Sequence, residues 1–157
     1  SRGLGDVYKR QILYIDLDNF KYCNDTFGHD IGDLMLKKLS SLFTEIVGDK
    51  GYCVRYGGDE FIIVLPGSST EFGIKISKQI YKKIEENGYF INDIANALKR
   101  PIEIDAQHRI SCSIGISTSQ KYNQESIMEC LKHADSALYD IKKGTKHDFK
   151  VWQKVQK

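Results

Sequence analysis

Apolar residues along the chain follow two different periods, and these periods predict strands and helices. Six short apolar or alternating runs favour strands, of which the fourth and fifth form a second hairpin. They are residues 12–15, 52–56, 60–65, 102–105, 109–117 and 149–152. Four stretches with apolar residues three or four positions apart predict amphipathic helices. They are residues 31–46, 69–87, 91–98 and 123–143. The first eleven residues show neither period, and we expect a lead-in segment or a cloning remnant there.

Turn-forming and capping residues separate these segments. Gly57-Gly58 stands between two strand-like runs and predicts a tight hairpin, because such turns need positive φ. Ser69 or Thr70 caps the second long helix, which ends at Asn87-Gly88. Asn123 caps the last long helix.

The order of the elements predicts an α+β protein. When the elements added to the core are left out, the order is β-α-β-β-α-β followed by a C-terminal helix. This order is typical of the ferredoxin-like βαββαβ core. In that fold an antiparallel-type sheet has helices on one face, and the first strand lies beside the first hairpin. A length of 157 residues suits one hydrophobic core, so we expect a single domain over residues 12–157.

The composition is that of an ordinary globular protein. Hydrophobic residues make up 41% and charged residues 28%, which excludes global disorder. The net charge is only +2, too balanced for binding nucleic-acid phosphates, so no nucleic-acid partner is expected. Apolar runs are too short to cross a membrane. Four widely spaced cysteines without a C-x-x-C pair favour reduced thiols in a cytosol-like, cytoplasmic compartment.

Three carboxylates are expected to meet where the first strand ends. Asp16 follows the first apolar run, and the fold places it opposite the turn that carries Asp59 and Glu60. Two like charges 4 Å apart repel by about 4 kcal/mol at an effective dielectric of 20, and no basic residue is adjacent in sequence. A divalent cation, such as Mg²⁺ with phosphates, would relieve this repulsion. The alternatives are a solvated turn and an acid that merely ends a strand.

A polar, glycine-containing segment over residues 19–33 predicts a ligand-holding loop between strand and helix. Asn24 offers a donor and an acceptor, and Asp33 an acceptor, which suits the edge of a base. Alternatively, Asn24 forms a turn and Asp33 is a surface acid in the first turn of a helix. Gly57 and Gly58 leave the hairpin tip without side chains, so a nucleoside could lie against the backbone there.

Several motifs, in the same order, resemble the GGDEF family of diguanylate cyclases. They are DLDNFK at 16–21, ND at 24–25, FGH at 27–29, GD at 32–33, RYGGDEF at 55–61, SIGI at 113–116, ADSALY at 134–139 and K at 142. The match runs from about residue 12 to residue 152. The resemblance implies condensation of two GTP molecules into cyclic di-GMP with release of pyrophosphate. It also implies Mg²⁺ or Mn²⁺ as cofactor and a homodimer in which each half-site holds one GTP.

The resemblance also implies roles for single residues. Asp16 and Asp59 would hold metal through their side chains, and Leu17 through its carbonyl oxygen. Asp59 would accept the proton of the attacking 3′-hydroxyl, while Glu60 would assist a second metal or that hydroxyl. A bound metal would lower the pKa of the hydroxyl and offset the charge that develops on the phosphate.

Substrate contacts follow from the same resemblance. The residues concerned are Phe20, Lys21, Asn24, His29, Asp33, Gly57, Gly58 and Lys142. Asn24 and Asp33 would read guanine, with His29 near the same nucleotide. The backbone amides of residues 20 and 21 and the side chain of Lys142 would meet the phosphates.

The chain departs from the family in three places. Residues 1–11 do not match the family's preceding helix and its D-x-L-T segment, so we expect a domain truncated at the N-terminus. The family's G-R-N-R is replaced by Lys143-Gly144-Thr145-Lys146, which lacks the arginine, and Lys146 is the candidate to replace it, without bidentate geometry. The R-x-x-D of a product-inhibition site reads Gly48-Asp49-Lys50-Gly51. We therefore expect no tight binding of cyclic di-GMP there.

Two further expectations concern function and neighbours. The insert over residues 87–109 is similar to GGDEF domains that stand in tandem with an EAL phosphodiesterase domain, so flanking sensor or EAL domains, and a membrane-tethered full-length protein, are compatible with it. The alternative function is a weak or inactive GGDEF module that binds GTP and regulates a neighbouring domain. An RNA-binding ferredoxin-like module lacks support, because the aromatic motif expected on its sheet is absent.

Overall fold

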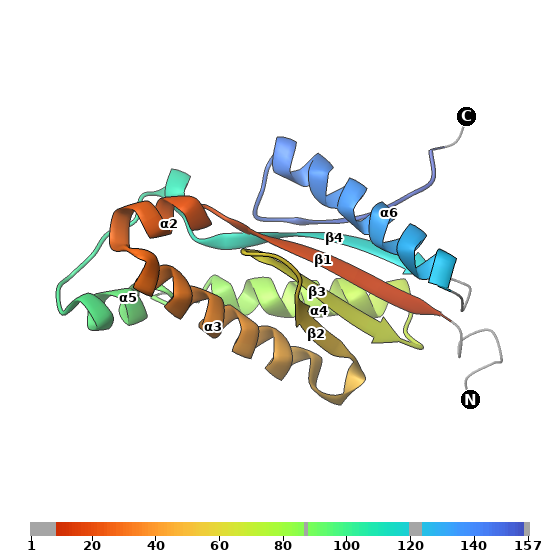
Figure 1. The fold of residues 1–157 in the computed structure, drawn as a ribbon, viewed down its shortest axis with the longest axis horizontal. Helices are drawn as coiled ribbons and strands as arrows, with labels where there is room; N and C mark the ends of the chain where they lie inside the picture. Colours follow the sequence, from red (N-terminus) through yellow and green to blue (C-terminus); the bar gives the residue numbers. More distant parts are fainter. Residues whose placement is uncertain (1–8, 87, 120–123, 156–157) are drawn as a thin grey trace.

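A computed structural model describes residues 9–86, 88–119 and 124–155 of the chain (Figure 1). The strands are β1 (Arg10–Asp18), β2 (Tyr52–Arg55), β3 (Glu60–Pro66), β4 (Ser111–Ser119) and β5 (Phe149–Val151). The helices are α2 (Phe20–Phe27), α3 (His29–Val47), α4 (Thr70–Ile84), α5 (Ile91–Leu98) and α6 (Gln124–Lys143). Two short 3₁₀ turns are η1 (Gly48–Lys50) and η2 (Ala106–His108).

The five strands form one sheet with the order β2-β3-β1-β4-β5. Strand β1 is central and pairs antiparallel with β3 and with β4, whereas β5 runs parallel to β4. Strands β2 and β3 form the predicted hairpin. The arrangement confirms the predicted α+β, ferredoxin-like class, and it confirms that β1 lies beside the hairpin.

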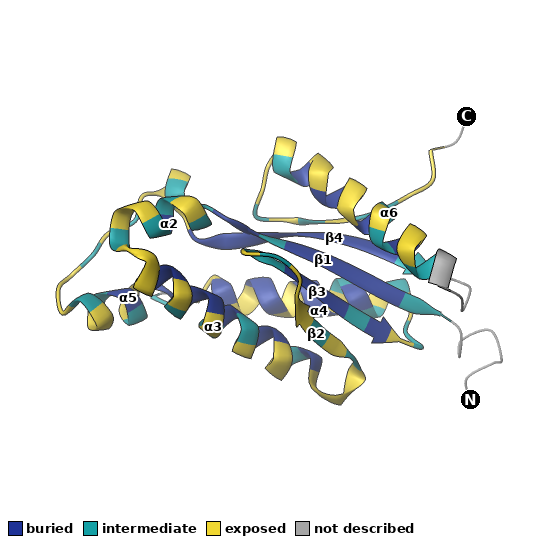
Figure 2. Ribbon diagram, in the orientation of Figure 1, coloured by how far each residue is buried: buried dark blue, intermediate teal, exposed yellow. Residues whose placement is uncertain are grey.

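Helices cover both faces of the sheet (Figure 1). Helices α3 and α4 lie on one face, as predicted, where they bury Leu13 and Ile15 of β1 in the main core. Helix α6 covers the opposite face, over Ile12 and Tyr14 of the same strand. Because alternate residues of a strand point to opposite faces, β1 is apolar on both sides and buried along most of its length (Figure 2).

Close packing of α6 on the sheet depends on Gly115 of β4. A Cβ atom at this position would lie 2.0 Å from the carbonyl oxygen of Ala134. The backbone of α6 therefore contacts the backbone of β4 directly. This contact places the last turn of α6, which contains Lys142, above the end of β1.

Three predicted elements differ in the structure. Strand β1 begins at Arg10, inside the segment expected to be a lead-in. The expected loop over residues 19–33 is wrong, because it contains helix α2 and the start of α3. The expected strand over residues 102–105 is also wrong. Its apolar Ile102 and Ile104 pack against the core without joining the sheet, and the chain then enters η2, where the Asp105 side chain caps the amide of His108.

The hairpin turn reaches its shape without the positive φ that was predicted for its glycines. The described glycines with positive φ are Gly28, Gly48, Gly67 and Gly88. The turn is closed by Arg55, which donates hydrogen bonds to the carbonyl oxygens of Gly57 and Gly58 at 3.2 and 2.8 Å. The prediction of the hairpin was right, and its reason was wrong.

Two of the predicted helix ends concern residues that the structure does not describe. The cap at Asn123 and the helix end at Asn87 lie outside the described residues. The four cysteines are free, as predicted. Among the described residues, no helix has both the length and the apolar character needed to span a membrane.

Candidate active site

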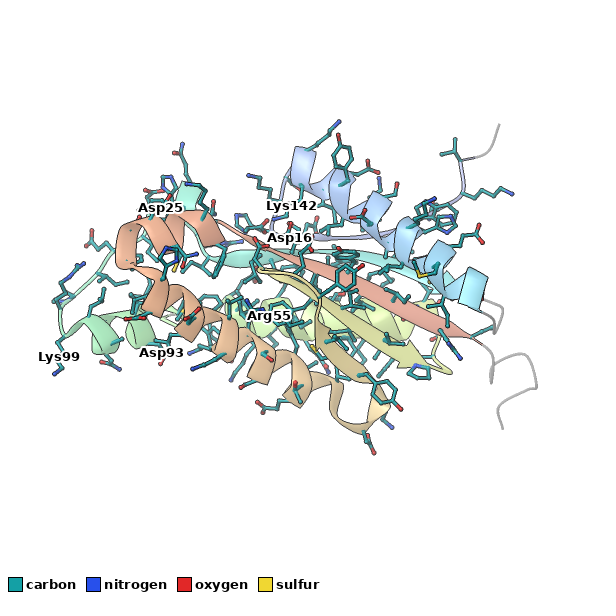
Figure 3. The ribbon with its side chains drawn as sticks, viewed as in Figure 1. Asp16, Asp25, Arg55, Asp93, Lys99 and Lys142 are labelled. Carbon is teal, nitrogen blue, oxygen red and sulfur yellow. The ribbon has the colours of Figure 1, made fainter. Side chains whose placement is uncertain are left out.

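A pocket of about 440 Å³ opens where β1 ends, between the hairpin turn, the start of α2 and the last turns of α6. Its lining residues are Asp16, Leu17, Asn19, Phe20, Lys21, Asp59, Glu60, Asp135, Leu138, Tyr139 and Lys142. Figure 3 shows Asp16 and Lys142 beside each other at this place. The pocket therefore gathers residues from three separate segments of the chain, residues 16–21, 59–60 and 135–142.

Sheet register brings the predicted carboxylates together. Asp16 pairs with Glu60 across β1 and β3, and the amide of Leu17 donates a 3.1 Å hydrogen bond to the carbonyl oxygen of Asp59. Burial, together with the charges of Asp59 and Glu60, raises the pKa of Asp16 to about 6 despite the opposing effect of Lys142. The predicted proximity of the three acids is confirmed.

A basic residue distant in sequence lies against these acids. The ammonium nitrogen of Lys142 donates to the carbonyl oxygen of Leu17 at 3.0 Å and to Oδ1 of Asp18 at 2.6 Å. It also lies 3.7 Å from Oδ2 of Asp16. The absence of a sequence-adjacent basic residue was therefore misleading, because α6 supplies one in space.

Asp18 forms a buried polar centre behind the pocket. Its side chain is 0% exposed and accepts hydrogen bonds from the hydroxyl of Ser113, at 2.9 and 3.0 Å to its two oxygens, and from Lys142. The amide of His147 adds a third donor at 3.1 Å, and burial lowers the pKa of the His147 ring. Sequence reasoning named Asp18 only as an acid at the end of the first strand and as part of a motif. Its spacing of two from Asp16 puts both acids on one face of β1, a signal that was available.

Glu60 is confined by two neighbours. A Cβ atom at residue 57 would lie 2.6 Å from Oε2 of Glu60, so Gly57 leaves the room that the carboxylate uses. Tyr14, from the α6 side of β1, forms a side-chain hydrogen bond with Glu60. Burial and the charge of Glu60 raise the pKa of Tyr14, so this residue is a neutral donor. Tyr14 also packs edge-on against Tyr56 of the hairpin.

The start of α2 offers backbone amides to the pocket. Asn19 has a left-handed backbone (φ 64°), and its side chain makes no hydrogen bond that caps the helix. Instead, the side-chain amide nitrogen of Asn19 donates to the carbonyl oxygen of Arg109 at 2.7 Å. The first-turn amides, at Phe20 and Lys21, thus remain available to an anion. The side chain of Lys21 is exposed and pairs with Asp25.

The residues expected to read a base lie outside this pocket. Asn24 is on α2, while His29 and Asp33 are in the first turns of α3. Asn24 lies over Gly32, where a Cβ atom would be 1.7 Å from its Oδ1, so the side chain of Asn24 contacts the residue that precedes Asp33. Gly57 and Gly58 are in the turn that carries the lining acids, but they do not line the pocket themselves.

Sequence reasoning missed several lining residues. Asp135, Leu138 and Tyr139 face the pocket from α6, and Asn19 faces it from the start of α2. Asp135 adds a fourth carboxylate. The spacing of residues 135, 138 and 142 at three and four positions places them on one face of a helix, and this signal could have found them.

The acids suit a divalent cation only in part. Within the described part of the chain, no three His, Cys, Asp or Glu side chains form a ready-made metal cluster. However, Oδ1 of Asp16 is buried and has no hydrogen-bond partner among the described residues. The Leu17 carbonyl oxygen already contacts a cation, the Lys142 ammonium. These oxygens fit a metal whose other ligands come from phosphate groups or water.

Comparison with known proteins shows the family. Residues 5–148 match the family model described as diguanylate cyclase, GGDEF domain, and the chain belongs to this family. A relative named diguanylate cyclase, from Vibrio cholerae serotype O1, is 34% identical over 132 residues. That match covers 84% of this chain but 36% of the relative, so the chain spans about a third of that relative's length.

Solved structures show the same fold. The active GGEEF domain of a diguanylate cyclase from Vibrio cholerae superposes with a TM-score of 0.76 at 28% identity, covering 94% of this chain and 85% of that one. An EAL/GGDEF domain protein from M. capsulatus gives a TM-score of 0.67 at 30% identity, covering 94% and 86%.

Proposed function

We propose that this domain condenses two GTP molecules into cyclic di-GMP with release of pyrophosphate. The observation that carries the proposal is the pocket in which four carboxylates, two lysines and a helix N-terminus meet, in a chain of the diguanylate cyclase family. Acids to deprotonate a hydroxyl and cationic or amide groups to hold a triphosphate are the parts that phosphoryl transfer requires.

The metal in this proposal is Mg²⁺, with Mn²⁺ as its substitute. Asp16, Asp59 and the Leu17 carbonyl oxygen would hold it, with Glu60 available to a second ion. The partnerless Oδ1 of Asp16 and the cation already on Leu17 support this assignment. When bound, the metal would stabilise the negative charge that develops on the transferring phosphate.

The side chains perform the remaining steps. Asp59 accepts the proton of the 3′-hydroxyl of one GTP. The oxygen of that hydroxyl forms a bond with the α-phosphorus of the other GTP, and the bond between this phosphorus and the leaving pyrophosphate breaks. Tyr14 and the space above Gly57 hold the Glu60 carboxylate beside the reacting groups. The amides of residues 20 and 21, with Lys142, hold the triphosphate.

Guanine selection belongs to the α2–α3 pair. Asn24 is held against Gly32, the residue before Asp33 on α3, and His29 lies one turn earlier on the same helix. A carboxylate next to an amide matches the N–H and carbonyl edge of guanine, whereas adenine offers no such N–H edge.

Catalysis needs two half-sites, since each domain holds one GTP and the product joins two. We therefore propose a homodimer, brought together by flanking sensor or EAL domains. The match covers only 36% of the Vibrio cholerae relative, which accords with further domains. The missing arginine favours the second candidate, a GTP-binding module with little turnover. Lys146, its expected replacement, does not line the pocket.

Incubation with GTP and Mg²⁺, followed by chromatography for cyclic di-GMP, tests the proposal. The unmodified domain should form product, and Asp59→Ala should abolish it while circular dichroism stays unchanged. Asp49→Ala, which removes an exposed acid of η1 outside this pocket, is the matched control and should retain activity. Unchanged product formation by Asp59→Ala would refute the mechanism. GTP binding without any product from the unmodified domain, even when dimerised by a fused coiled coil, would favour the second candidate.

A further inference from the structure

Lys142 contacts the oxygen atoms that the proposed function assigns to a metal ion. Its ammonium nitrogen is 3.0 Å from the carbonyl oxygen of Leu17 and 3.7 Å from Oδ2 of Asp16. Two cations at such separations repel each other strongly. A divalent ion therefore cannot take up these ligands while the ammonium stays where it is.

Asp18 holds the ammonium in this position from behind. The 2.6 Å contact to Oδ1 of Asp18 is the shortest of the contacts that the ammonium makes with these oxygens. Asp18 is fully buried and does not line the pocket, so it cannot serve the substrate directly. Ser113 and the amide of His147 fix its orientation. A buried carboxylate with neutral donors around it needs one positive partner, and Lys142 is that partner.

We propose that Lys142 is an internal counter-ion, which occupies the metal-facing oxygens until a nucleotide arrives and which Asp18 anchors there. This inference rests on the proposed function, because that function names Leu17 and Asp16 as metal ligands. Lysine suits the role because its compact charge sits on a flexible four-carbon stem. The triphosphate draws the ammonium off Leu17, and the metal takes its place. Metal and triphosphate therefore bind cooperatively, and metal alone binds weakly.

The proposal predicts that one substitution changes the affinity for metal alone and the affinity for nucleotide in opposite directions. Lys142→Met removes the competing charge and frees the Leu17 oxygen, so metal alone should bind more tightly. The same change removes a triphosphate contact, so the nucleotide should bind more weakly. A purely structural role would weaken both, and a simple phosphate contact would leave the affinity for bare metal nearly unchanged.

Calorimetric and electron paramagnetic resonance titrations with Mn²⁺ alone, then with Mn²⁺ and a non-hydrolysable GTP analogue, measure both effects. Lys142→Met should raise the affinity for Mn²⁺ alone at least about tenfold and should lower the affinity for the nucleotide. Lys143→Met is the matched control. It removes the same charge one residue away, where the ammonium lies 4.4 Å from the ring centre of Tyr139, and should change the Mn²⁺ affinity less than about twofold.

A second variant distinguishes a change in metal affinity from a loss of the folded state. Lys142→Met leaves Asp18 buried without its cation, so Asp18→Asn/Lys142→Met, which removes both charges, is titrated as well and should show the same gain. Mn²⁺ affinity that is unchanged or lower in the folded variant, or equal gains in the Lys143 control, would overturn the inference. The titrations need no turnover. A domain that forms no cyclic di-GMP but shows the opposite effects refutes the proposed activity and leaves the counter-ion intact.

Discussion

Asp16 carries a charge that the fold disfavours, and Asp16→Asn should therefore stabilise the metal-free protein. Burial and the neighbouring acids raise the pKa of Asp16 from 3.8 to about 6, and its side chain is only 26% exposed. This difference is roughly two pH units, and each corresponds to about 1.4 kcal/mol, so ionised Asp16 costs the fold up to about 3 kcal/mol.

The sign of the effect fixes its pH dependence. The folded state binds this proton more tightly than the unfolded chain does, so the penalty is absent below about pH 4. Stability is lost as the pH rises from 3.8 to about 6, and the full penalty is present above that range. Asparagine never ionises and avoids the penalty. The stability gain of Asp16→Asn should therefore appear at pH 7.5 and vanish at pH 4.

Urea unfolding with a chelator at both pH values measures the gain. Asp25→Asn, at an exposed carboxylate of α2, is the control and should change the free energy of unfolding by less than about 0.5 kcal/mol. Mg²⁺ added together with a non-hydrolysable GTP analogue should stabilise the unmodified protein at pH 7.5 more than it stabilises Asp16→Asn. A variant that is less stable than the unmodified protein at pH 7.5, or a gain that persists at pH 4, would refute the reasoning.

Three further outcomes are expected. Gly57→Ala should cost about 1 kcal/mol in thermal unfolding, because the new Cβ meets a carboxylate at 2.6 Å, whereas Gly58→Ala meets open space and should change stability by less than about 0.5 kcal/mol. In competition binding, GTP should exceed ATP by at least about tenfold, and Asp33→Ala should erode that ratio; equal affinities in the unmodified protein would contradict the assignment. Calorimetry should find no micromolar binding of cyclic di-GMP at η1. The positions that match the R-x-x-D arginine and acid are Gly48, with φ 55°, and Gly51, where a Cβ would lie 2.1 Å from a backbone oxygen of β3.

The fold and the meeting of the acids could be predicted from the sequence because both follow from local patterns. The apolar run before Asp16 and the paired runs around Gly57 define adjacent strands, and strand pairing alone then brings Asp16 opposite Glu60. Helix α2 was missed because polar residues dominate the segment. Its apolar Phe20, Cys23 and Phe27 nevertheless stand three and four positions apart, so a short helical signal was available.

The cation in the pocket could not be predicted from spacing. Lys142 meets Asp18 across 124 residues of sequence, through the docking of α6 on β4 at Gly115. Only the family resemblance named Lys142, and it assigned the residue to phosphates rather than to protein oxygens. The role of Ser113 as a donor to Asp18 likewise depends on the register of β4 against β1.

The separation between Asp18 and Lys142 also constrains the order of folding during synthesis. The carboxylate belongs to the first strand, but its cation is made 124 residues later. Until α6 leaves the ribosome and docks, the end of β1 must either keep Asp18 in water or bury an unpaired charge, and the second is strongly unfavourable. The tip of the central strand should therefore order last, although its other end can pair with β3 early. The pocket would then form only when nearly all of the domain has been synthesised, so partly made chains present no nucleotide site.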